Sequence, residues 1–200
     1  MWSSEKEKQI QFSVDAFSSG QISSKLWLCQ ELEPIIKRSF QQPPIIWILG
    51  GWYGMTAFLW LARSPHSVAF FRSFDIDPSC QPLADGLNEN WVWQKWKFKA
   101  FTQDCNELNF ENLEFGPTPQ VIINTACEHF SSRQWWEKIP PGRLIALQSN
   151  DLPDETHVNR VTSLEDLATQ YPMQKTFFSG MLTFHYPNSG FNRFMRIGVK

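Results

Sequence analysis

The stretch NTACEHF, residues 124 to 130, carries the densest set of side chains that could move a proton. It follows the apolar run VII and brings Asn124, Glu128 and His129 close together in the chain. An imidazole at this place could take a proton from a bound molecule, while Glu128 orients it and the Asn124 amide hydrogen bonds to the ligand. The alternative interpretation is a helix start with Glu128 in its first turn. The residue types alone leave both open.

Acids follow two other apolar runs. Asp75 ends SVAFFRSFD, and Asp104 follows KFKAFTQ. Ionised carboxylates accept hydrogen bonds, so both residues could bind the hydroxyl or amine groups of a ligand. Both could instead form turns or cap the helices that follow them.

A glycine-rich turn, GGWYGM, follows the apolar run IIWIL of residues 45 to 49. Gly50, Gly51 and Gly54 would let the main chain approach a ligand closely and direct free amides at it. The phosphate-binding G-x-x-x-x-G-K-[ST], the zinc-binding H-E-x-x-H and the G-x-S-x-G elbow are all absent. A dinucleotide site remains a weaker alternative, because its G-x-G-x-x-G spacing is not met.

These candidate residues stand at the ends of short apolar runs, several of which are followed by helical segments. Continuous apolar runs are typical of strands buried on both faces. The repeated pattern predicts a doubly wound α/β fold with a mostly parallel, seven-stranded sheet, helices on both faces, and ligands beyond the carboxyl ends of the strands. At the end of the chain, TFFSGMLTFHY and NRFMRIGVK predict an antiparallel hairpin joined through PNSGF.

The first 43 residues differ in pattern from the rest of the chain, because their apolar residues recur at partly helical spacing before QQPP. We therefore divide the chain into an N-terminal helical extension, residues 1–43, and an α/β domain, residues 44–200. Gly20, between two serine pairs, has the character of a hinge or helix break. The extension could be a lid from which Lys25 reaches an acidic acceptor, or a helical pair that only covers the sheet.

Composition limits the class of protein. The chain has 200 residues, 42% of them hydrophobic, which suits one domain with a substantial core. Its four cysteines are widely spaced and include no C-x-x-C pair, so we expect reduced, mostly buried thiols and no metal. The start has no signal-peptide pattern and no apolar run approaches the roughly 20 residues of a membrane span, so we expect a cytoplasmic protein without a membrane partner.

Charge argues against a nucleic-acid partner. The net charge is −2, which gives no field to attract a polyanion. The segment KWKFKAF interleaves Lys95, Lys97 and Lys99 with aromatic residues. Strict alternation explains it more simply, with lysines facing water and aromatics facing the core at a sheet edge.

The order of these features resembles the class I S-adenosylmethionine-dependent methyltransferases, and the resemblance covers residues 44–200. It implies that Gly50, Gly51 and Gly54 form the cofactor turn, that Asp75 binds the ribose hydroxyls, and that Asp104 accepts from the adenine amine while the Cys105 amide donates to the ring. It also implies a functional role for NTACEHF. The N-P-P-Y or D-P-P-Y motif of enzymes that methylate the adenine amine is absent, so methylation of bases is not expected.

The turn departs from the family pattern at two positions. Ile48 stands where the family has an acid, and Trp52 stands where it has a glycine. Without a free positive-φ position at residue 52, we expect the turn to take another shape. We also expect Trp52 and Tyr53 to form an aromatic wall beside the positively charged sulfonium of S-adenosylmethionine. The alternative is that Trp52 packs under the N-terminal helices.

The sequence thus predicts an enzyme that transfers the methyl group of S-adenosylmethionine to a small-molecule acceptor. An enzyme of the same fold could break another bond of the sulfonium, by aminocarboxypropyl transfer or cyclisation, and release methylthioadenosine. A non-catalytic nucleoside-binding module is the second alternative. The acceptor, the pathway and the oligomeric state are not predicted.

Overall fold

The structure is a computed structural model that describes residues 12–93, 95–186 and 189–200. Its strands are β1 (Ile45–Leu49), β2 (Phe70–Asp75), β3 (Val92–Trp93), β4 (Lys95–Trp96), β5 (Phe98–Thr102), β6 (Val121–Asn124), β7 (Leu144–Asn150), β8 (Lys175–Tyr186) and β9 (Ser189–Val199). Its α-helices are α1 (Ser19–Ser39), α2 (Met55–Arg63), α3 (Cys80–Asn88), α4 (Gln134–Lys138) and α5 (Leu164–Gln170). The 3₁₀ helices are η1 (Val14–Phe17), η2 (Cys105–Glu107), η3 (Leu113–Phe115) and η4 (Cys127–His129).

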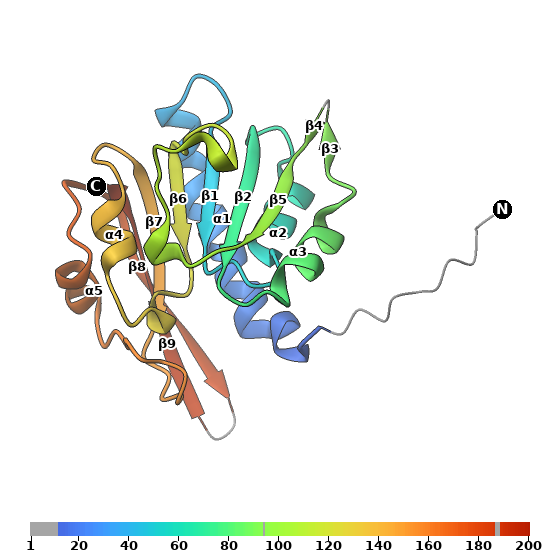
Figure 1. Ribbon diagram of the computed structural model, residues 1–200. Helices are drawn as coiled ribbons and strands as arrows, with labels where there is room; N and C mark the ends of the chain where they lie inside the picture. Colours follow the sequence, from blue (N-terminus) through green and yellow to red (C-terminus); the bar gives the residue numbers. More distant parts are fainter. Residues whose placement is uncertain (1–11, 94, 187–188) are drawn as a thin grey trace.

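Among the described residues, seven strands form one sheet in the order β5-β2-β1-β6-β7-β9-β8, and β3 and β4 form a short separate ribbon (Figure 1). The first five strands of that order are parallel to one another. Strand β9 is antiparallel to both β7 and β8. The predicted mostly parallel sheet with a C-terminal antiparallel hairpin is therefore confirmed.

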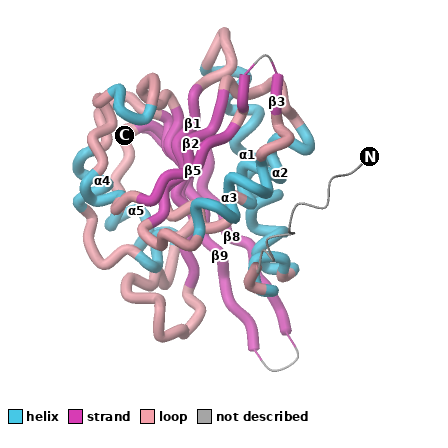
Figure 2. The backbone as a smooth tube through the Cα atoms, turned by 45° about the vertical axis from the view of Figure 1, so that its right-hand side comes forward, coloured by secondary structure: helices cyan, strands magenta, loops and turns pink. Residues whose placement is uncertain are grey.

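Both faces of the sheet are buried, as the continuous apolar runs require. In β1, Ile46 and Ile48 belong to one core cluster, whereas Trp47 and Leu49 belong to the other. Helices α1, α2 and α3 supply residues to the first cluster, and α4 and α5 supply residues to the second. Figure 2 shows the strands running between these two sets of helices. Alternate side chains of each strand thus bury apolar area on opposite faces, which is the main favourable term in folding.

The N-terminal segment packs on the sheet through α1. Leu28, Leu32 and Ile36 of this helix are buried in the first core cluster. The helix begins at Ser19, and the Ser18 side chain caps it by accepting from the Gln21 amide at 3.3 Å. The expected break at Gly20 is wrong, because Gly20 lies in the first turn of the helix and is buried. The helical prediction for residues 1–11 lies outside the described residues.

The edge strand β5 follows the predicted pattern only in part. It is at the edge of the sheet as expected. Just before it, however, Trp96 faces water and Lys97 faces the interior, which is the reverse of the prediction. Trp96 is 72% exposed, whereas Lys97 is 8% exposed and donates to the Val68 carbonyl at 2.8 Å. The alternation fails because a bend at residue 97 separates β4 from β5.

The four cysteines, Cys29, Cys80, Cys105 and Cys127, are all free and buried, which confirms the prediction of reduced thiols. No helix of the described residues is both long enough and apolar enough to cross a membrane.

Candidate functional site

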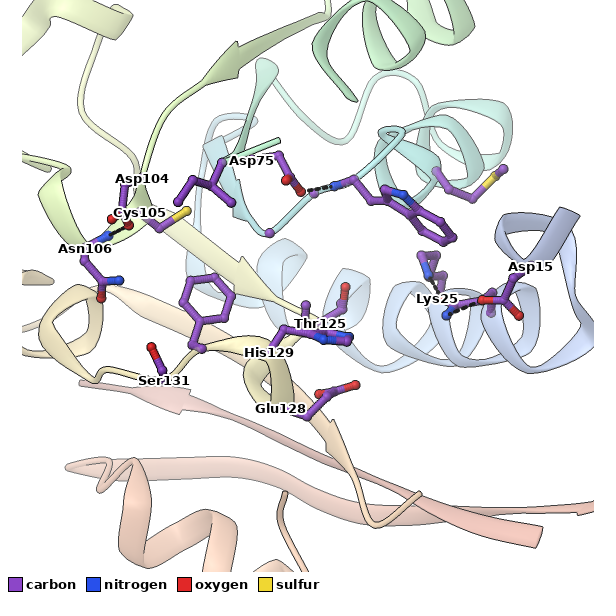
Figure 3. A pocket seen from close by; sticks show the side chains of 18 of the residues that line it. Asp15, Lys25, Asp75, Asp104, Cys105, Asn106, Thr125, Glu128, His129 and Ser131 are labelled. Atoms are coloured by element: carbon purple, nitrogen blue, oxygen red, sulfur yellow. Dashed lines mark hydrogen bonds between the residues drawn. The ribbon is translucent and has the colours of Figure 1, made fainter. Parts of the chain in front are cut away.

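The carboxyl ends of the parallel strands surround a cavity of about 550 Å³. This volume lies within the range of about 300 to 1,000 Å³ that small-molecule sites occupy. Figure 3 shows the cavity, with Asp104 and Cys105 on one side, Asp75 above, and Lys25 and Asp15 on the other side. The residues that line it are Asp15, Gln21, Lys25, Gly50, Gly51, Trp52, Met55, Asp75, Ile76, Asp104, Cys105, Asn106, Thr125, Ala126, Glu128, His129, Phe130, Ser131 and Arg193.

The glycine turn after β1 has a positive φ at position 52, where the family pattern has a glycine and this chain has a tryptophan. Trp52 has φ +48°, and it is the one described non-glycine residue with positive φ. The expectation that the turn must avoid this conformation is therefore wrong. A bulky residue in the left-handed region costs of order 1 kcal/mol or more, so the surrounding structure must hold it there.

The amides of this turn are bonded within the chain. The Gly51 amide donates to the Phe74 carbonyl at 3.0 Å, and the Gly54 amide donates to the Gly51 carbonyl at 2.9 Å. The Trp52 amide donates to Oδ2 of Asp75 at 2.8 Å. These three amides are not free for a ligand, contrary to the sequence-based expectation. The glycine at position 51 is required by packing instead, because a Cβ there would lie 1.9 Å from Oγ of Ser73.

Asp75 borders the cavity and fastens the turn to β2. Its second carboxylate oxygen, Oδ1, accepts from the Asp77 amide at 3.1 Å. Burial raises the pKa of Asp75, although the amides of Asp77 and Trp52 act to lower it. Each carboxylate oxygen has room for a second hydrogen bond. The carboxylate can therefore accept from a ligand without releasing the main chain.

Asp104 and Cys105 lie together on another side of the cavity. The Asp104 side chain caps η2 by accepting from the Asn106 amide at 2.8 Å. Capping and ligand contact are compatible, because Asp104 also lines the cavity. Burial raises the pKa of the Cys105 thiol to about 12, so this sulfur stays protonated at neutral pH.

Of the two aromatic residues in the turn, only Trp52 lines the cavity. Trp52 lines the cavity, and Tyr53 is stacked on it with ring centroids 4.5 Å apart. Tyr53 does not line the cavity, and its ring also packs edge-on against Phe12 at 5.3 Å. Trp52 can contact a ligand directly, whereas Tyr53 supports it from behind.

The side chains of the three NTACEHF residues that could act together form hydrogen bonds with other groups and not with one another. Asn124 is fully buried outside the cavity lining, and its Oδ1 accepts from the Ala126 amide at 2.9 Å. Glu128 is buried and accepts from Arg193 at 3.2 Å and from Asn150. His129 is exposed at the cavity, with Nδ1 3.2 Å from the Thr156 carbonyl. Glu128 therefore pairs with Arg193 and Asn150 in this structure, and not with His129.

Two cations missing from the predicted site line the same cavity. Lys25 comes from α1 and Arg193 from β9. The pKa of Lys25 is lowered from 10.5 to about 7, first because burial disfavours its ammonium form and second because Arg193 lies near; Glu128 and Asp15 act in the opposite direction. Sequence reasoning placed Lys25 only on a possible lid. It gave no signal for Arg193, which is far from the other site residues in the chain.

Comparison with known proteins identifies the fold. No protein-family model and no curated protein matches the sequence. Similar solved structures include magnesium protoporphyrin IX methyltransferase from Synechocystis PCC 6803 with bound SAM (S-adenosylmethionine), at 8% identity and a TM-score of 0.61, covering 94% of this chain and 86% of the other. The N-methyltransferase NodS from Bradyrhizobium japonicum has 10% identity and a TM-score of 0.62, covering 94% of this chain and 100% of the other.

A third similar structure is the plantazolicin methyltransferase BpumL in complex with SAH (S-adenosylhomocysteine). It has 10% identity and a TM-score of 0.57, covering 88% of this chain and 84% of the other. The chain therefore has the fold of the class I S-adenosylmethionine-dependent methyltransferases. At these identities the likeness concerns the fold, so activity must be argued from the site.

Proposed function

We propose that this protein binds S-adenosylmethionine and transfers its methyl group to a small-molecule acceptor. The observation that carries the proposal is that Asp75 at the end of β2, Asp104 after β5, and the start of the glycine turn after β1 all border one cavity. A nucleoside needs one group that accepts from its ribose hydroxyls and another that accepts from its base amine. Asp75 and Asp104 supply them from neighbouring strands.

In this proposal the adenosine lies between Asp104 and Asp75. Asp104 accepts from the adenine amine, the Cys105 amide donates to the ring, and Asp75 accepts from the ribose hydroxyls. Ile76, which is 69% exposed at the cavity, offers apolar contact to the planar base. Gly50 and Gly51 line the cavity beside the ribose and methionine portions. Gly54 lies outside the lining, where a Cβ would meet Asn88 and Phe98, so it supports the turn and does not contact the ligand.

The methionine end then points past Trp52, toward the side that holds Lys25. An aromatic face attracts the sulfonium cation by about 0.5 to 2 kcal/mol. Tyr53 fixes the indole by stacking on it, and Asn124 shapes the chain that leads to η4. We infer that the N-terminal segment covers this end of the cavity, because Asp15, Gln21 and Lys25 line it from outside the sheet.

The acceptor is placed between His129, Lys25 and the Glu128–Arg193 pair. Methyl transfer forms a bond from the acceptor's nucleophile to the methyl carbon as the bond from that carbon to sulfur breaks, leaving a neutral thioether. Holding donor and acceptor in line supplies much of the acceleration of such a reaction. His129, which is exposed at the cavity, contacts the nucleophilic group of the acceptor in this proposal.

The test is calorimetry with S-adenosylmethionine and S-adenosylhomocysteine, followed by mass spectrometry of the ligands that stay with the protein through purification. We expect both to bind and the nucleoside product of turnover to be S-adenosylhomocysteine. Methylthioadenosine would instead identify an enzyme that breaks another sulfonium bond, and binding without any product would identify a binding module. Binding of NAD in place of both nucleosides would overturn the proposal.

A further inference from the structure

Three potential metal ligands meet at the rim of the cavity. Glu128, His129 and His157 each offer one ligand atom, and these atoms lie within 4.8 Å of one another. His157 is supplied by the loop after β7, and the other two by η4. We propose that these three side chains form a binding site for a divalent transition-metal ion of the zinc class.

Each of the two imidazoles has its Nδ1 beside a main-chain carbonyl. Nδ1 of His157 is 2.9 Å from the Leu152 carbonyl, and Nδ1 of His129 is 3.2 Å from the Thr156 carbonyl. A carbonyl can only accept, so in the neutral ring Nδ1 carries the proton and Nε2 keeps its lone pair. A ring N–H donated to a carbonyl is the usual outer-shell support of a metal-binding histidine, because it fixes the tautomer and the ring orientation.

The carboxylate supplies an unsatisfied oxygen. Glu128 is 2% exposed, and its Oε1 accepts from both Asn150 and Arg193. Its Oε2 is buried and has no hydrogen-bond partner within the described part of the chain. Leaving a buried carboxylate oxygen without a hydrogen-bond partner is unfavourable. A cation bound to Oε2 would remove that cost without displacing Arg193.

The loop that presents His157 is fixed to Glu128. The main-chain amide of Asn159 donates to the Glu128 carbonyl at 2.9 Å, and the main-chain amide of Leu152 donates to Oδ1 of Asn150 at 2.9 Å. Within the loop, Oδ1 of Asp154 accepts from the Thr156 amide at 2.8 Å. The positions of the three ligands are thus set by one network of hydrogen bonds.

The donor set indicates the kind of ion. Two imidazole nitrogens and one carboxylate oxygen suit zinc or iron(II), whereas magnesium and calcium favour oxygen ligands. Ligands bonded at about 2.0 to 2.2 Å lie no more than about 4.4 Å apart, so the exposed His129 ring would close slightly on the ion. Three protein ligands leave a position open, which is the arrangement of a catalytic site.

The open position would face the cavity, because Glu128 and His129 both line it. The ion would there hold an oxygen or nitrogen of the acceptor and favour its deprotonated, nucleophilic form. His129 then acts as a metal ligand, since a coordinated imidazole has no lone pair left to accept a proton. This role of the ion rests on the proposed methyl transfer, whereas the ion site itself does not.

The experiment uses the full chain without a polyhistidine tag, stripped of metal with EDTA and dialysed. Zinc chloride is titrated by calorimetry, and cobalt(II) is added in parallel so that its visible absorption reports the coordination geometry. We expect about one ion per chain and a loss of about tenfold or more in His157→Ala, since even outer-shell changes cost about 10- to 100-fold in metal affinity. His185→Ala, which removes an exposed histidine of β8, is the matched control and should bind like the wild type.

Wild-type binding no tighter than that of the His129→Ala/His157→Ala double variant would overturn the site. So would an affinity that falls equally in His185→Ala and His157→Ala. His157→Gln is measured as well, with circular dichroism on every variant, so that unfolding is not mistaken for a lost ligand. Titration of S-adenosylhomocysteine into the stripped protein separates the two proposals: cofactor binding without zinc binding refutes the ion site alone, and zinc binding without cofactor binding refutes the methyltransferase alone.

Discussion

The main-chain amide of Trp52 donates to Oδ2 of Asp75 at 2.8 Å, and this bond joins the turn after β1 to the acid after β2. Trp52 lies in the turn that follows β1, and Asp75 is the last residue of β2, the parallel neighbour of β1 in the sheet. One bond therefore holds the indole at the cavity and stabilises a φ of +48° that a tryptophan rarely adopts. The carboxylate proposed to bind the ribose also shapes the turn.

Asp75→Ala should weaken the binding of S-adenosylhomocysteine by about 1.5 to 3 kcal/mol, the range for hydrogen bonds to a charged group. Calorimetry on the folded variant measures this. Asp77→Ala is the matched control, because Asp77 is an exposed acid of the same loop that does not line the cavity. Equal affinities in Asp75→Ala and the wild type would remove the ribose assignment.

Trp52→Gly should lower the affinity for S-adenosylmethionine more than the affinity for S-adenosylhomocysteine. The difference should be about 0.5 to 2 kcal/mol, because only the sulfonium carries the charge that the indole attracts. Glycine also accepts the positive φ, so the turn should keep its shape. Trp52→Phe retains an aromatic face and should lose less. If both ligands lose the same free energy in Trp52→Gly, the indole serves packing and not the sulfonium.

Gly51→Ala should destabilise the fold by about 1 to 3 kcal/mol, the usual cost of overpacking a core. The new methyl group would meet Oγ of Ser73 at 1.9 Å. Adding Ser73→Ala should restore much of the loss, because that change removes the clashing oxygen. Urea unfolding of the two single variants and the double variant gives the coupling free energy. Purely additive effects would show that the close approach of Gly51 to Ser73 is not the cause.

Lys25 should make stability depend on pH. Its folded-state pKa is about 7, below the ordinary lysine value of 10.5, so between these values the unfolded chain alone holds the proton. The free energy of unfolding should therefore rise from pH 7 toward pH 10, relative to Lys25→Met, with a slope of up to about 1.4 kcal/mol per pH unit. Below pH 7 Lys25 is protonated in both the folded and the unfolded chain, so the free energy of unfolding is lowered by the full cost of burying the ammonium.

Chemical denaturation in EDTA at several pH values, on the wild type and Lys25→Met, measures this difference. Lys95→Met, which removes an exposed lysine of β4, should track the wild type. A wild-type minus Lys25→Met difference that does not change with pH would contradict the lowered pKa.

His129→Ala should reduce single-turnover methyl transfer by about 10²- to 10⁴-fold, the range for a group that assists proton loss from the acceptor. Affinity for S-adenosylhomocysteine should stay within a few-fold, because His129 is placed at the acceptor and not at the nucleoside. Glu128→Gln, measured in parallel, should lower the rate as well. A wild-type rate in His129→Ala would exclude any role for this residue in the reaction.

The sheet and its layers were predictable because their signals are local. IIWIL and VII (residues 121 to 123) are apolar throughout, and only a strand covered on both faces buries such a run. The positions of Asp75 and Asp104 after their strands follow from the same pattern, since parallel strands end at one edge. Both acids border the cavity as a result.

Other features were decided by contacts that no local pattern encodes. Glu128 is bonded to Arg193, 65 residues away, and not to the adjacent His129. His157 reaches η4 only because hydrogen bonds fold the loop after β7 back onto Glu128. Trp52 takes a positive φ, which glycine favours, because Asp75 accepts a hydrogen bond from its main-chain amide. Lys97 turns inward because a bend interrupts the alternation of side chains before β5. The sequence by itself determined which segments must be buried, since burial depends on side-chain type and spacing. Only the tertiary structure decided which polar groups pair, because each pairing depends on the distance between atoms that the fold brings together.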